Sequence, residues 1–425
     1  MRRLALLLHH AGTAPDLIYP SLKKLEDVEI VTFYIKSKTN AALNRVYDEC
    51  VGTIGPSIEC SNEEDMYNEV IKYHQKSPIT GVLTFAEMLI KTANMLSKLL
   101  GKSYMEDSTI VALQNKYEQR KILKNNKVSV PNFYEILSEK DLRRAAEVIG
   151  FPAILKPNYG GGAYGIFEVH DFETLEKRYQ EEQEKFENII LEGEKSTFNL
   201  EEVIIGEDWQ VNEKLADYCS VETIVQNGKI FHLTVSDRTK LVPPFRESGY
   251  ILPSSLAMNH QDEVKELTTR ALKALKVNNL MTHTEIKFTK NGPKIIEVNG
   301  RPGGTVPFRL KNATDGEYDL FIELAKLALG DKINPKITYK KFSASKISHC
   351  PEGNWKIKDI NFEKLKNIPS LTLLIPIKSA GDYVDSYRGI EDILGLYYLE
   401  NPNVNELIND MVSIDDLLKV EYERV

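Results

Sequence analysis

The chain has little cysteine and no apolar run long enough to cross a membrane. Its cysteines, Cys50, Cys60, Cys219 and Cys350, are scattered, and no two form a CxxC pair. Zinc sites and disulfide frameworks need grouped cysteines, so neither is predicted. The apolar run Leu4–Leu8 follows two arginines but is too short for a secretory signal. We interpret it as a buried strand, and we expect a cytoplasmic protein without a membrane partner.

The sequence also lacks an excess of positive charge. It holds 54 Lys and Arg against 62 Asp and Glu, a net charge of -8. Nucleic-acid-binding proteins usually present a basic surface, so no nucleic-acid partner is expected. Hydrophobic residues make up 42% and charged residues 27%, which is ordinary for a globular protein. A chain of 425 residues exceeds one hydrophobic core, so about three domains are expected.

The signature of a dinucleotide site is missing from the first quarter of the chain. Residues 3 to about 105 alternate strand and helix patterns, which predicts a parallel sheet. No GxGxxG follows the first strand. Ligands of such sheets lie beyond the carboxyl ends of strands, so Glu87, just past the predicted strand Gly81–Thr84, is a candidate substrate contact. Alternatively, Glu87 only stabilises the dipole of the helix that follows.

The strongest chemical pattern is a predicted β-hairpin over Thr282–Arg301. Apolar and polar residues alternate in both arms around a three-residue loop, Lys290–Gly292. The predicted register opposes polar residues in pairs on one face, Glu285 with Glu297 and His283 with Asn299. The other face carries the predicted core residues Ile286, Phe288, Ile296 and Val298.

The opposed carboxylates of this hairpin need a compensating charge. Like charges with Cβ atoms roughly 5 Å apart destabilise a strand pair. The oxygen donors of Glu285, Glu297 and Asn299 suit Mg²⁺ that is held partly by substrate phosphates. Arg301, two residues further on, has the geometry to bind a phosphate or carboxylate through two hydrogen bonds. The alternative is a solvated hairpin face with ordinary surface charges.

A glycine-rich segment, Asn158–Gly165, joins two predicted strands. It follows Lys156 and contains three consecutive glycines, Gly160–Gly162. Backbone N–H groups of such a segment can surround a polyphosphate, because no Cβ hinders its approach. It is not a GxxxxGK[ST] P-loop, since the lysine precedes the glycines and a strand follows. We interpret it as a flexible flap over phosphates; the alternative is a mobile hairpin tip.

Three further segments carry weaker signals. An amphipathic helix predicted over 109–126 holds Lys116 in its middle, where a solvated lysine is the plain alternative. The run Leu200–Asp208 suits an extended segment whose backbone meets adenine and whose last acid meets ribose, or else an ordinary strand and turn. A polar loop predicted over Ser236–Ser255 is long, and long loops tend to be functional.

In their order and spacing, these segments resemble the ATP-grasp superfamily between about 105 and 310. The ATP contacts that the resemblance implies are Lys116, Lys156, Gly160, Gly161, Gly162, Glu201, Glu202, Ile204 and Asp208. The implied metal ligands are Glu285, Glu297 and Asn299. The implied cofactors are therefore ATP and Mg²⁺, two ions in the family, with Mn²⁺ as a possible substitute.

Within the superfamily, Glu247-Ser-Gly-Tyr250 and His283-Thr-Glu285 look like the bacterial L-amino-acid ligases, which make dipeptides. This implies ATP-dependent joining of a carboxylate and an amine through an acyl phosphate, with Arg301 as the catalytic residue. The implied substrate contacts are Glu87, Glu247, Tyr250, His283 and Arg301. Tyr250 stands where those ligases often have histidine, so the choice of amino acid does not carry over.

Three alternative functions stay open at this point. Biotin and purine-pathway carboxylases share the ATP motifs, and a ligase for a different carboxylate would share them too. A nucleotide sensor without chemistry is the rival from another class. Small molecules, ATP and amino acids, are the expected partners, and a homodimer is left open.

The implied fold is α/β, with a Rossmann-like parallel-sheet domain over 1–108. An ATP-grasp fold follows, in which two α+β subdomains clasp ATP. We expect its small subdomain, with the flap, over 109–200, and its large subdomain, with the metal site, over 201–334. A strand-rich extension is expected over 335–425.

Overall fold

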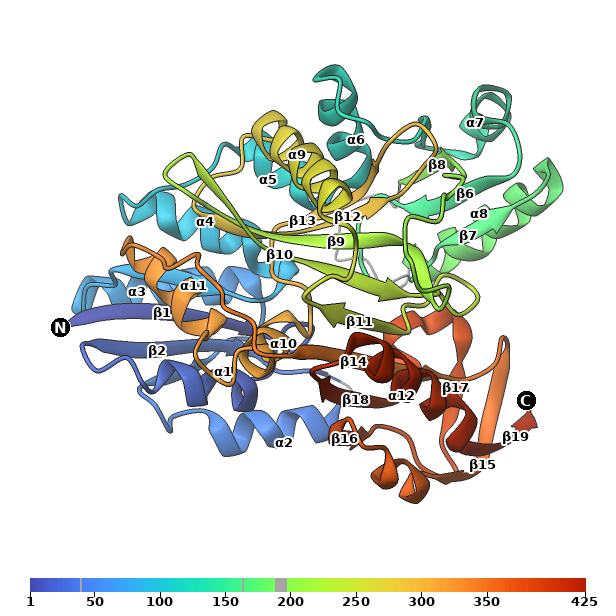
Figure 1. The fold of residues 1–425 in the computed structure, drawn as a ribbon. Helices are drawn as coiled ribbons and strands as arrows, with labels where there is room; N and C mark the ends of the chain where they lie inside the picture. Colours follow the sequence, from blue (N-terminus) through green and yellow to red (C-terminus); the bar gives the residue numbers. More distant parts are fainter. Residues whose placement is uncertain (39, 163, 188–196) are drawn as a thin grey trace.

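A computed structural model describes residues 1–38, 40–162, 164–187 and 197–425, which form four sheets (Figure 1). The first sheet is parallel and has the order β3-β2-β1-β4, as the alternating pattern predicts. Its strands are β1 (Arg2–His9), β2 (Val28–Ile35), β3 (Ser57–Glu59) and β4 (Gly81–Thr84). The helices around it are α1 (Pro15–Leu22), α2 (Ala41–Cys50), α3 (Glu63–Lys76) and α4 (Ile90–Leu99).

The helix predicted over 109–126 is wrong in one respect, because the chain breaks it at Asn115. Helix α5 (Asp107–Gln114) ends there, and α6 (Lys116–Asn125) begins. Asn115 is extended, and its side chain accepts a hydrogen bond from Glu118 N, which caps α6. Lys116 is therefore the first residue of a helix and is buried, not exposed in the middle of one.

A small four-stranded sheet carries the glycine-rich segment. Its order is β5-β8-β6-β7, and α7 (Leu142–Ile149) and α8 (Phe172–Glu187) pack on it. The strands are β5 (Phe133–Ile136), β6 (Ala153–Pro157), β7 (Phe167–Val169) and β8 (Phe198–Glu202). The segment joins β6 to β7, as predicted, although Ala163 within it lies outside the described residues.

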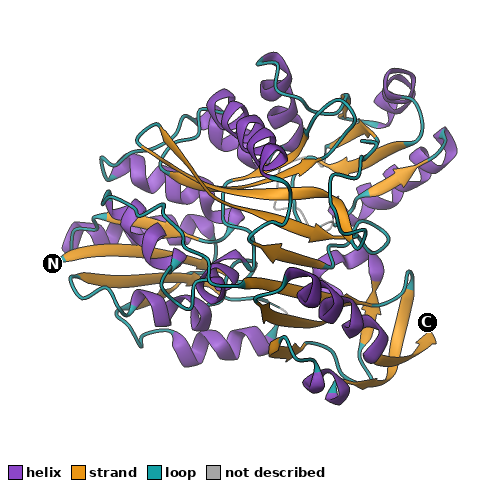
Figure 2. Ribbon diagram, viewed as in Figure 1, coloured by secondary structure: helices purple, strands orange, loops and turns teal. Residues whose placement is uncertain are grey.

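An eight-stranded antiparallel sheet forms the centre of the molecule (Figure 2). Its order is β13-β12-β9-β10-β11-β14-β18-β16. Five strands come from the middle of the chain: β9 (Leu215–Gln226), β10 (Lys229–Thr239), β11 (Gly249–Leu252), β12 (Leu280–Lys287) and β13 (Lys294–Asn299). The others are β14 (Phe342–His349), β16 (Leu371–Pro376) and β18 (Ile393–Asn401). The strand-rich end of the chain thus extends the sheet that carries the predicted hairpin.

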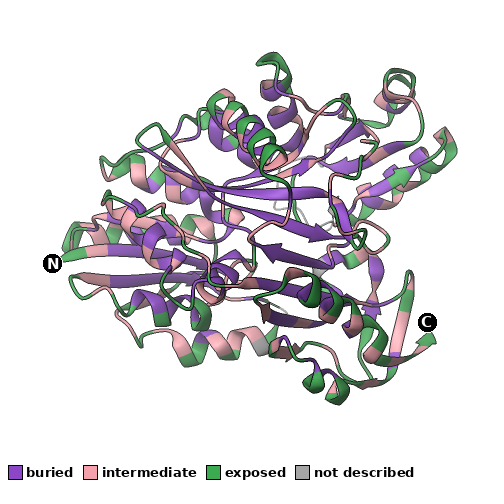
Figure 3. Cartoon of the chain, in the orientation of Figure 1, coloured by how far each residue is buried: buried purple, intermediate pink, exposed green. Residues whose placement is uncertain are grey.

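Helices cover both faces of this sheet, and its strands are largely buried (Figure 3). On one face lies α9 (Met258–Ala274), whose buried side is part of a core with β9 and β12. Helices α10 (Val306–Ala313) and α11 (Leu320–Leu329) share a second core with β1 and α1. The N-terminal and central sheets are therefore joined by continuous apolar packing.

The last part of the chain adds a small sheet and a helix. The sheet has the order β17-β15-β19, formed by β15 (Asn354–Asn361), β17 (Tyr383–Asp385) and β19 (Lys419–Arg424). Helix α12 (Val404–Leu417) packs against β14 and β18. No helix in the described parts of the chain combines the length and apolar character that a bilayer crossing requires.

The predicted hairpin register is confirmed at its polar end, where His283 pairs with Asn299 and Glu285 with Glu297. The predicted three-residue loop is wrong, because β12 ends at Lys287 and β13 begins only at Lys294. A bulge after Glu285 places one extra residue in β13. The residues of β13 that precede this extra residue therefore point to the face opposite to the one predicted. Two isoleucines show the consequence: Ile295 is buried in the core, whereas Ile296, predicted there, lines a cavity.

Two other predicted elements differ from the structure. The polar loop over Ser236–Ser255 is partly strand, since β10 runs to Thr239 and β11 pairs with it. The sequence also predicts a strand over Trp209–Leu215, but these residues, all of them described, form none before β9 starts at Leu215. The Trp209 ring instead stacks on that of Phe288, with centroids 4.9 Å apart. Aromatic stacking, not strand pairing, fixes this segment.

Candidate functional site

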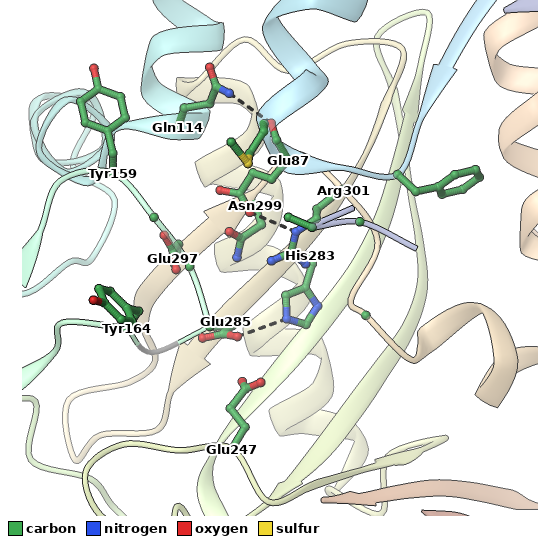
Figure 4. A pocket seen from close by; sticks show the side chains of 18 of the residues that line it. Glu87, Gln114, Tyr159, Tyr164, Glu247, His283, Glu285, Glu297, Asn299 and Arg301 are labelled. Carbon is green, nitrogen blue, oxygen red and sulfur yellow. Dashed lines mark hydrogen bonds and ion pairs between the residues drawn. The ribbon is translucent and has the colours of Figure 1, made fainter. Parts of the chain in front are cut away.

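A cavity of about 2320 Å³ lies where the N-terminal sheet, the small sheet and the central sheet meet. Nearly every predicted site residue lines it: Glu87, Lys116, Lys156, Gly160, Gly161, Gly162, Glu201, Glu202, Ile204, Glu247, Tyr250, His283, Glu285, Glu297, Asn299 and Arg301. Figure 4 shows the side chains of 18 residues that line this cavity and labels ten of them, among them the paired acids of the hairpin. Residues that lie up to about 200 positions apart are thus brought to one place.

Lys116 connects the hairpin to the glycine-rich segment. Its Nζ lies 2.9 Å from Glu297 Oε1 and donates a hydrogen bond to Gly160 O at 2.5 Å. The side chain is buried because the Asn115 cap turns the start of α6 into the cavity. A cation held between a carboxylate and glycine backbone is well placed to bind a phosphate.

Lys156 forms a buried charge cluster with two other residues. Its Nζ lies 2.7 Å from Glu201 Oε2, and Arg120 Nε donates to Glu201 Oε1 at 2.9 Å. Burial lowers the pKa of Lys156 to about 8, although Glu201 opposes the shift. Burial would raise the pKa of Glu201, but Arg120 and Lys156 outweigh it and the pKa is lowered. Glu201 therefore holds two cations in place. Sequence motifs gave no signal for Arg120.

One end of the cavity is lined by Glu202, Val203, Ile204 and Ile296. Glu202 is fixed by Lys294 Nζ and Asn132 Nδ2, each 2.7 Å from one of its oxygens. Asp208 is the exception among the predicted residues, because it is exposed and does not line the cavity. Its carboxylate accepts a hydrogen bond from Gln210 N at 3.1 Å. The ribose role implied for Asp208 has no support from its position.

The two hairpin acids face the cavity with compensating charges beside them. His283 Nε2 lies 3.2 Å from Glu285 Oε1, and Arg238 Nη2 lies 3.6 Å from the same oxygen. Burial would raise the pKa of Glu285, but Arg238, His283 and Arg301 hold it at about 2. Burial likewise opposes the charge of His283, yet Glu222 and Glu285 raise its pKa. Glu285 is therefore fully ionised near neutral pH.

The hairpin residues offer too few ligands to hold a cation unless a substrate supplies the others. Within the described residues, no group of three or more His, Cys, Asp or Glu side chains forms a ready metal site. Glu285 and Glu297 oppose one another, and the buried Asn299 adds an amide oxygen on the same face. These are oxygen donors of the kind that Mg²⁺ takes, and too few to enclose it.

Arg301 joins the hairpin to the N-terminal sheet. Its Nε donates a hydrogen bond to Glu87 Oε2 at 3.0 Å, and Nη1 donates to Pro302 O at 3.2 Å (Figure 4). Glu87 follows β4, as the strand-end argument predicts. A Cβ added to Gly161 would lie 4.0 Å from Glu87 Oε2, so the glycine-rich segment crosses the cavity as far as Glu87.

Arg238 is the main residue that sequence reasoning missed. It is fully buried, it forms ion pairs with Glu247 and Glu285, and its guanidinium lies 4.2 Å from the Tyr250 ring centroid. The Tyr250 hydroxyl donates a hydrogen bond to Glu247. Arg238 of β10 pairs with Tyr250 of β11. This pairing could have indicated Arg238, but the segment is interpreted as a loop from its sequence.

The end of the chain also lines the cavity, which no motif indicated. The lining residues from this region are Lys378, Arg388, Glu391, Asp392, Leu396 and Tyr398. Tyr387, next to Arg388, stacks on Phe167 of the small sheet, with ring centroids 5.9 Å apart. The small sheet and the end of the chain therefore touch beside the cavity.

Part of this chain is similar to a known protein family. Residues 149–307 match the family described as the ATP-grasp domain. Alanine–anticapsin ligase of Bacillus subtilis (strain 168) is 29% identical over 251 residues, which are 57% of this chain and 52% of that ligase. The chain thus spans about half the length of that relative. The L-arginine-specific L-amino acid ligase of Bacillus subtilis is 24% identical over 77% of this chain and 76% of its own.

The fold is also that of a solved ligase structure. The L-amino acid ligase from Bacillus licheniformis superposes with a TM-score of 0.76, at 20% identity, over 100% of this chain and 99% of that one. The α/β fold class predicted from the sequence, including the strand-rich C-terminal region, is therefore confirmed. The predicted resemblance is confirmed as well: residues 149–307 match the ATP-grasp domain family, and the chain is similar to L-amino-acid ligases.

Proposed function

We propose that this protein is an ATP-dependent carboxylate–amine ligase that joins L-amino acids into dipeptides and releases ADP and phosphate. The observation that carries the proposal is the shared cavity. It is lined by two lysines suited to binding phosphates, by a pair of opposed acids and by an arginine: Lys116, Lys156, Glu285, Glu297 and Arg301. The similarity to two L-amino-acid-joining enzymes supports it.

ATP is proposed to lie between the small sheet and the hairpin. Lys116, Lys156 and the backbone of Gly160–Gly162 would bind its phosphates, because Lys116 contacts both Glu297 and Gly160, and Lys156 lines the same cavity. Adenine would occupy the end lined by Val203, Ile204 and Ile296. We also propose that the small sheet, within the lid subdomain expected over 109–200, moves over the central sheet, to which residues 335–425 contribute β14, β16 and β18.

Glu285, Glu297 and Asn299 would hold Mg²⁺, proposed as two ions bound together with ATP. The metal supplies charge compensation for the phosphoryl oxygens when it is bound. The ionised state of Glu285 suits this role, because its carboxylate needs no deprotonation before binding.

The proposed reaction has two steps. In the first, a carboxylate oxygen of one amino acid attacks the γ-phosphorus of ATP, the bond from that phosphorus to the β,γ-bridging oxygen breaks, and ADP leaves. In the second, the amine of the other amino acid attacks the acyl carbon, loses a proton and displaces phosphate. Arg301 would neutralise charge on the acyl oxygens in both steps, and Glu87 and Glu247 would bind a substrate ammonium. The glycine-rich flap would exclude water from the acyl phosphate.

The test is release of ADP and phosphate from ATP and Mg²⁺ with amino acids supplied singly and in pairs, with products identified by mass spectrometry. A dipeptide formed in equal amount to ADP is the expected result. Turnover that depends on bicarbonate, without a dipeptide, would indicate a carboxylase instead. ATP binding without turnover under any of these conditions would contradict the proposal and favour a sensor.

A further inference from the structure

The geometry points to an aromatic, apolar side pocket next to Arg301, and we infer that the amino acid bound there carries a large apolar side chain. The pocket is formed by Tyr250, Phe308, Leu396 and Tyr398, two of which come from the end of the chain. The inference rests on the proposed function and adds a substrate class to it.

The floor of the pocket is a row of residues across three strands. Tyr250 of β11 pairs with Ser345 of β14, and Ser345 pairs with Tyr398 of β18. Directly paired residues in antiparallel strands project from the same face of a sheet. The small Ser345 therefore lies between two tyrosine rings, and its hydroxyl is engaged with Thr305 Oγ1 at 2.8 Å. Both tyrosines line the cavity, so the row contributes two aromatic rings to the walls of the side pocket, or recess.

Two more side chains complete the walls. The Phe308 ring lies edge-on to that of Tyr398, with centroids 5.9 Å apart and planes at 63°. Leu396 lies two residues before Tyr398, so it projects from the same face of β18. It packs against the apolar cluster that contains Tyr250. The recess is thus bounded by aromatic and aliphatic groups.

The recess begins at the residue proposed to bind the substrate carboxylate. The segment from the end of β13 into the first turn of α10 lines the cavity through Arg301, Pro302, Gly304, Thr305 and Phe308. Glu247 lies on the wall that carries Tyr250, since the tyrosine hydroxyl bonds to its carboxylate. An amino acid with its carboxylate at Arg301 would direct its side chain along this first turn into the recess.

The charged residues near the recess include Arg309, Lys378 and Asp392. Arg309 is buried behind Tyr250, 5.0 Å from its ring centroid, and donates hydrogen bonds to Thr305 Oγ1 and Ser236 Oγ. At the rim, Lys378 Nζ lies 2.8 Å from Asp392 Oδ1. An apolar substrate side chain would gain from burial against the aromatic and aliphatic walls of the recess.

A strained backbone conformation near Glu247 also places an aromatic side chain at the cavity. Phe245, two residues before Glu247, lines the cavity with a φ of 71°. A bulky side chain rarely adopts this left-handed conformation, and such strain concentrates at functional sites. The strain holds one more aromatic ring at the cavity, beside the acid proposed to bind the ammonium.

The experiment narrows the recess with Leu396→Trp and uses Leu373→Trp as the matched control, because Leu373 is 50% exposed on β16 and does not line the cavity. Binding of alanine, leucine, phenylalanine, aspartate and lysine is followed by thermal shift and calorimetry in the presence of Mg²⁺ and ADP. The ratio of kcat/KM for phenylalanine to that for alanine is measured in the ligase assay. We expect leucine and phenylalanine to bind best, and Leu396→Trp to lower that ratio by about tenfold or more.

The binding measurement separates this inference from the proposed function. Preference for aspartate or lysine, or equal binding of leucine and phenylalanine to the wild type and Leu396→Trp, would overturn the inference even if dipeptides are formed. Selective binding of leucine or phenylalanine, weakened by Leu396→Trp and unchanged by Leu373→Trp, would support the pocket even if no ligation is detected, in which case only the proposed reaction fails.

Discussion

The buried guanidinium of Arg238 lies 3.6 Å from Glu285 Oε1, and the same side chain forms an ion pair with Glu247. One cation thus connects the acid proposed to bind Mg²⁺ with the acid proposed to bind the substrate ammonium. Tyr218 and Tyr250 hold the guanidinium between their rings, at 5.1 and 4.2 Å from the ring centroids. The position of either carboxylate therefore depends on Arg238.

Replacement of Arg238 by methionine should destabilise the protein. Removal of one partner of a buried ion pair typically costs about 3 kcal/mol, because the remaining charge is uncompensated. Urea unfolding of Arg238→Met, Glu247→Gln and the double variant measures this as a double-mutant cycle. We expect the double variant to be more stable than the sum of the single losses predicts. Strict additivity would show that the two side chains are not coupled.

Replacement of Glu297 should abolish ATP turnover while the fold is retained. The carboxylate is proposed to bind Mg²⁺, and its loss would remove several kcal/mol of charge stabilisation, on the order of 10³-fold in kcat. Glu297→Ala is compared with Glu168→Ala, which removes an exposed carboxylate outside the cavity. Thermal unfolding checks that both variants fold. Near-normal turnover of Glu297→Ala would remove Glu297 from the metal site.

Replacement of Arg301 should lower kcat more than it weakens ATP binding. Its guanidinium is proposed to act on the acyl oxygens, and loss of one such group typically costs on the order of 10²-fold. Arg301→Lys keeps a charge but loses the planar pair of donors, so we expect it to recover little. Steady-state kinetics and an ATP titration measure both effects. An unchanged kcat in Arg301→Ala would exclude Arg301 from the chemical steps.

Local sequence was enough to predict the polar face of the hairpin. Alternation in Thr282–Arg301 fixed which residues share a face, and the pairing of Glu285 with Glu297 followed from it. The bulge after Glu285 was not predictable from alternation, because a regular alternating pattern carries no signal for one extra residue in β13. It changed the core residue from Ile296 to Ile295 without moving the acids.

Contacts between segments far apart in the sequence could not be predicted from local patterns. The Asn115 cap that places Lys116 in the cavity is a single side-chain hydrogen bond within an otherwise helical pattern. Leu396 and Tyr398 reach the cavity only because the end of the chain joins the central sheet beside β11 through β14. Residue types and spacing carry no record of which strands become neighbours, so these walls required the structure.

Stability should fall as the pH is lowered from about 6.5 toward 4, in part because of His232. Burial, and Lys265 to a smaller extent, lower the pKa of His232 to about 4, while its ring nitrogens lie 2.9 and 2.8 Å from the hydroxyls of Thr223 and Thr269. In this window the unfolded chain binds a proton that the folded chain does not, so the free energy of unfolding decreases with falling pH. His232→Gln should flatten this decrease.

Urea unfolding between pH 7 and 4 measures the effect of His232, with the exposed His170→Gln as the control. His9, whose pKa burial and His10 also lower to about 4, should leave part of the decrease in place. An identical pH dependence in the wild type and His232→Gln would show that His232 does not contribute to it.

ATP affinity should decrease above pH 8, because Lys156 loses its proton there. Burial, assisted by Arg120, lowers the pKa of Lys156 to about 8, and only the protonated amine attracts a phosphate. Titration of ATP and Mg²⁺ between pH 6.5 and 9.5 should give a constant affinity below the pKa and a progressive loss above it. Lys156→Arg stays charged over this range, so its affinity should be independent of pH even if it is weaker at neutrality. A wild-type ATP affinity that is as independent of pH as that of Lys156→Arg would show that Lys156 either keeps its proton or does not contact the phosphates. Lys156→Met distinguishes the two cases, because it weakens ATP binding only if Lys156 contacts the phosphates.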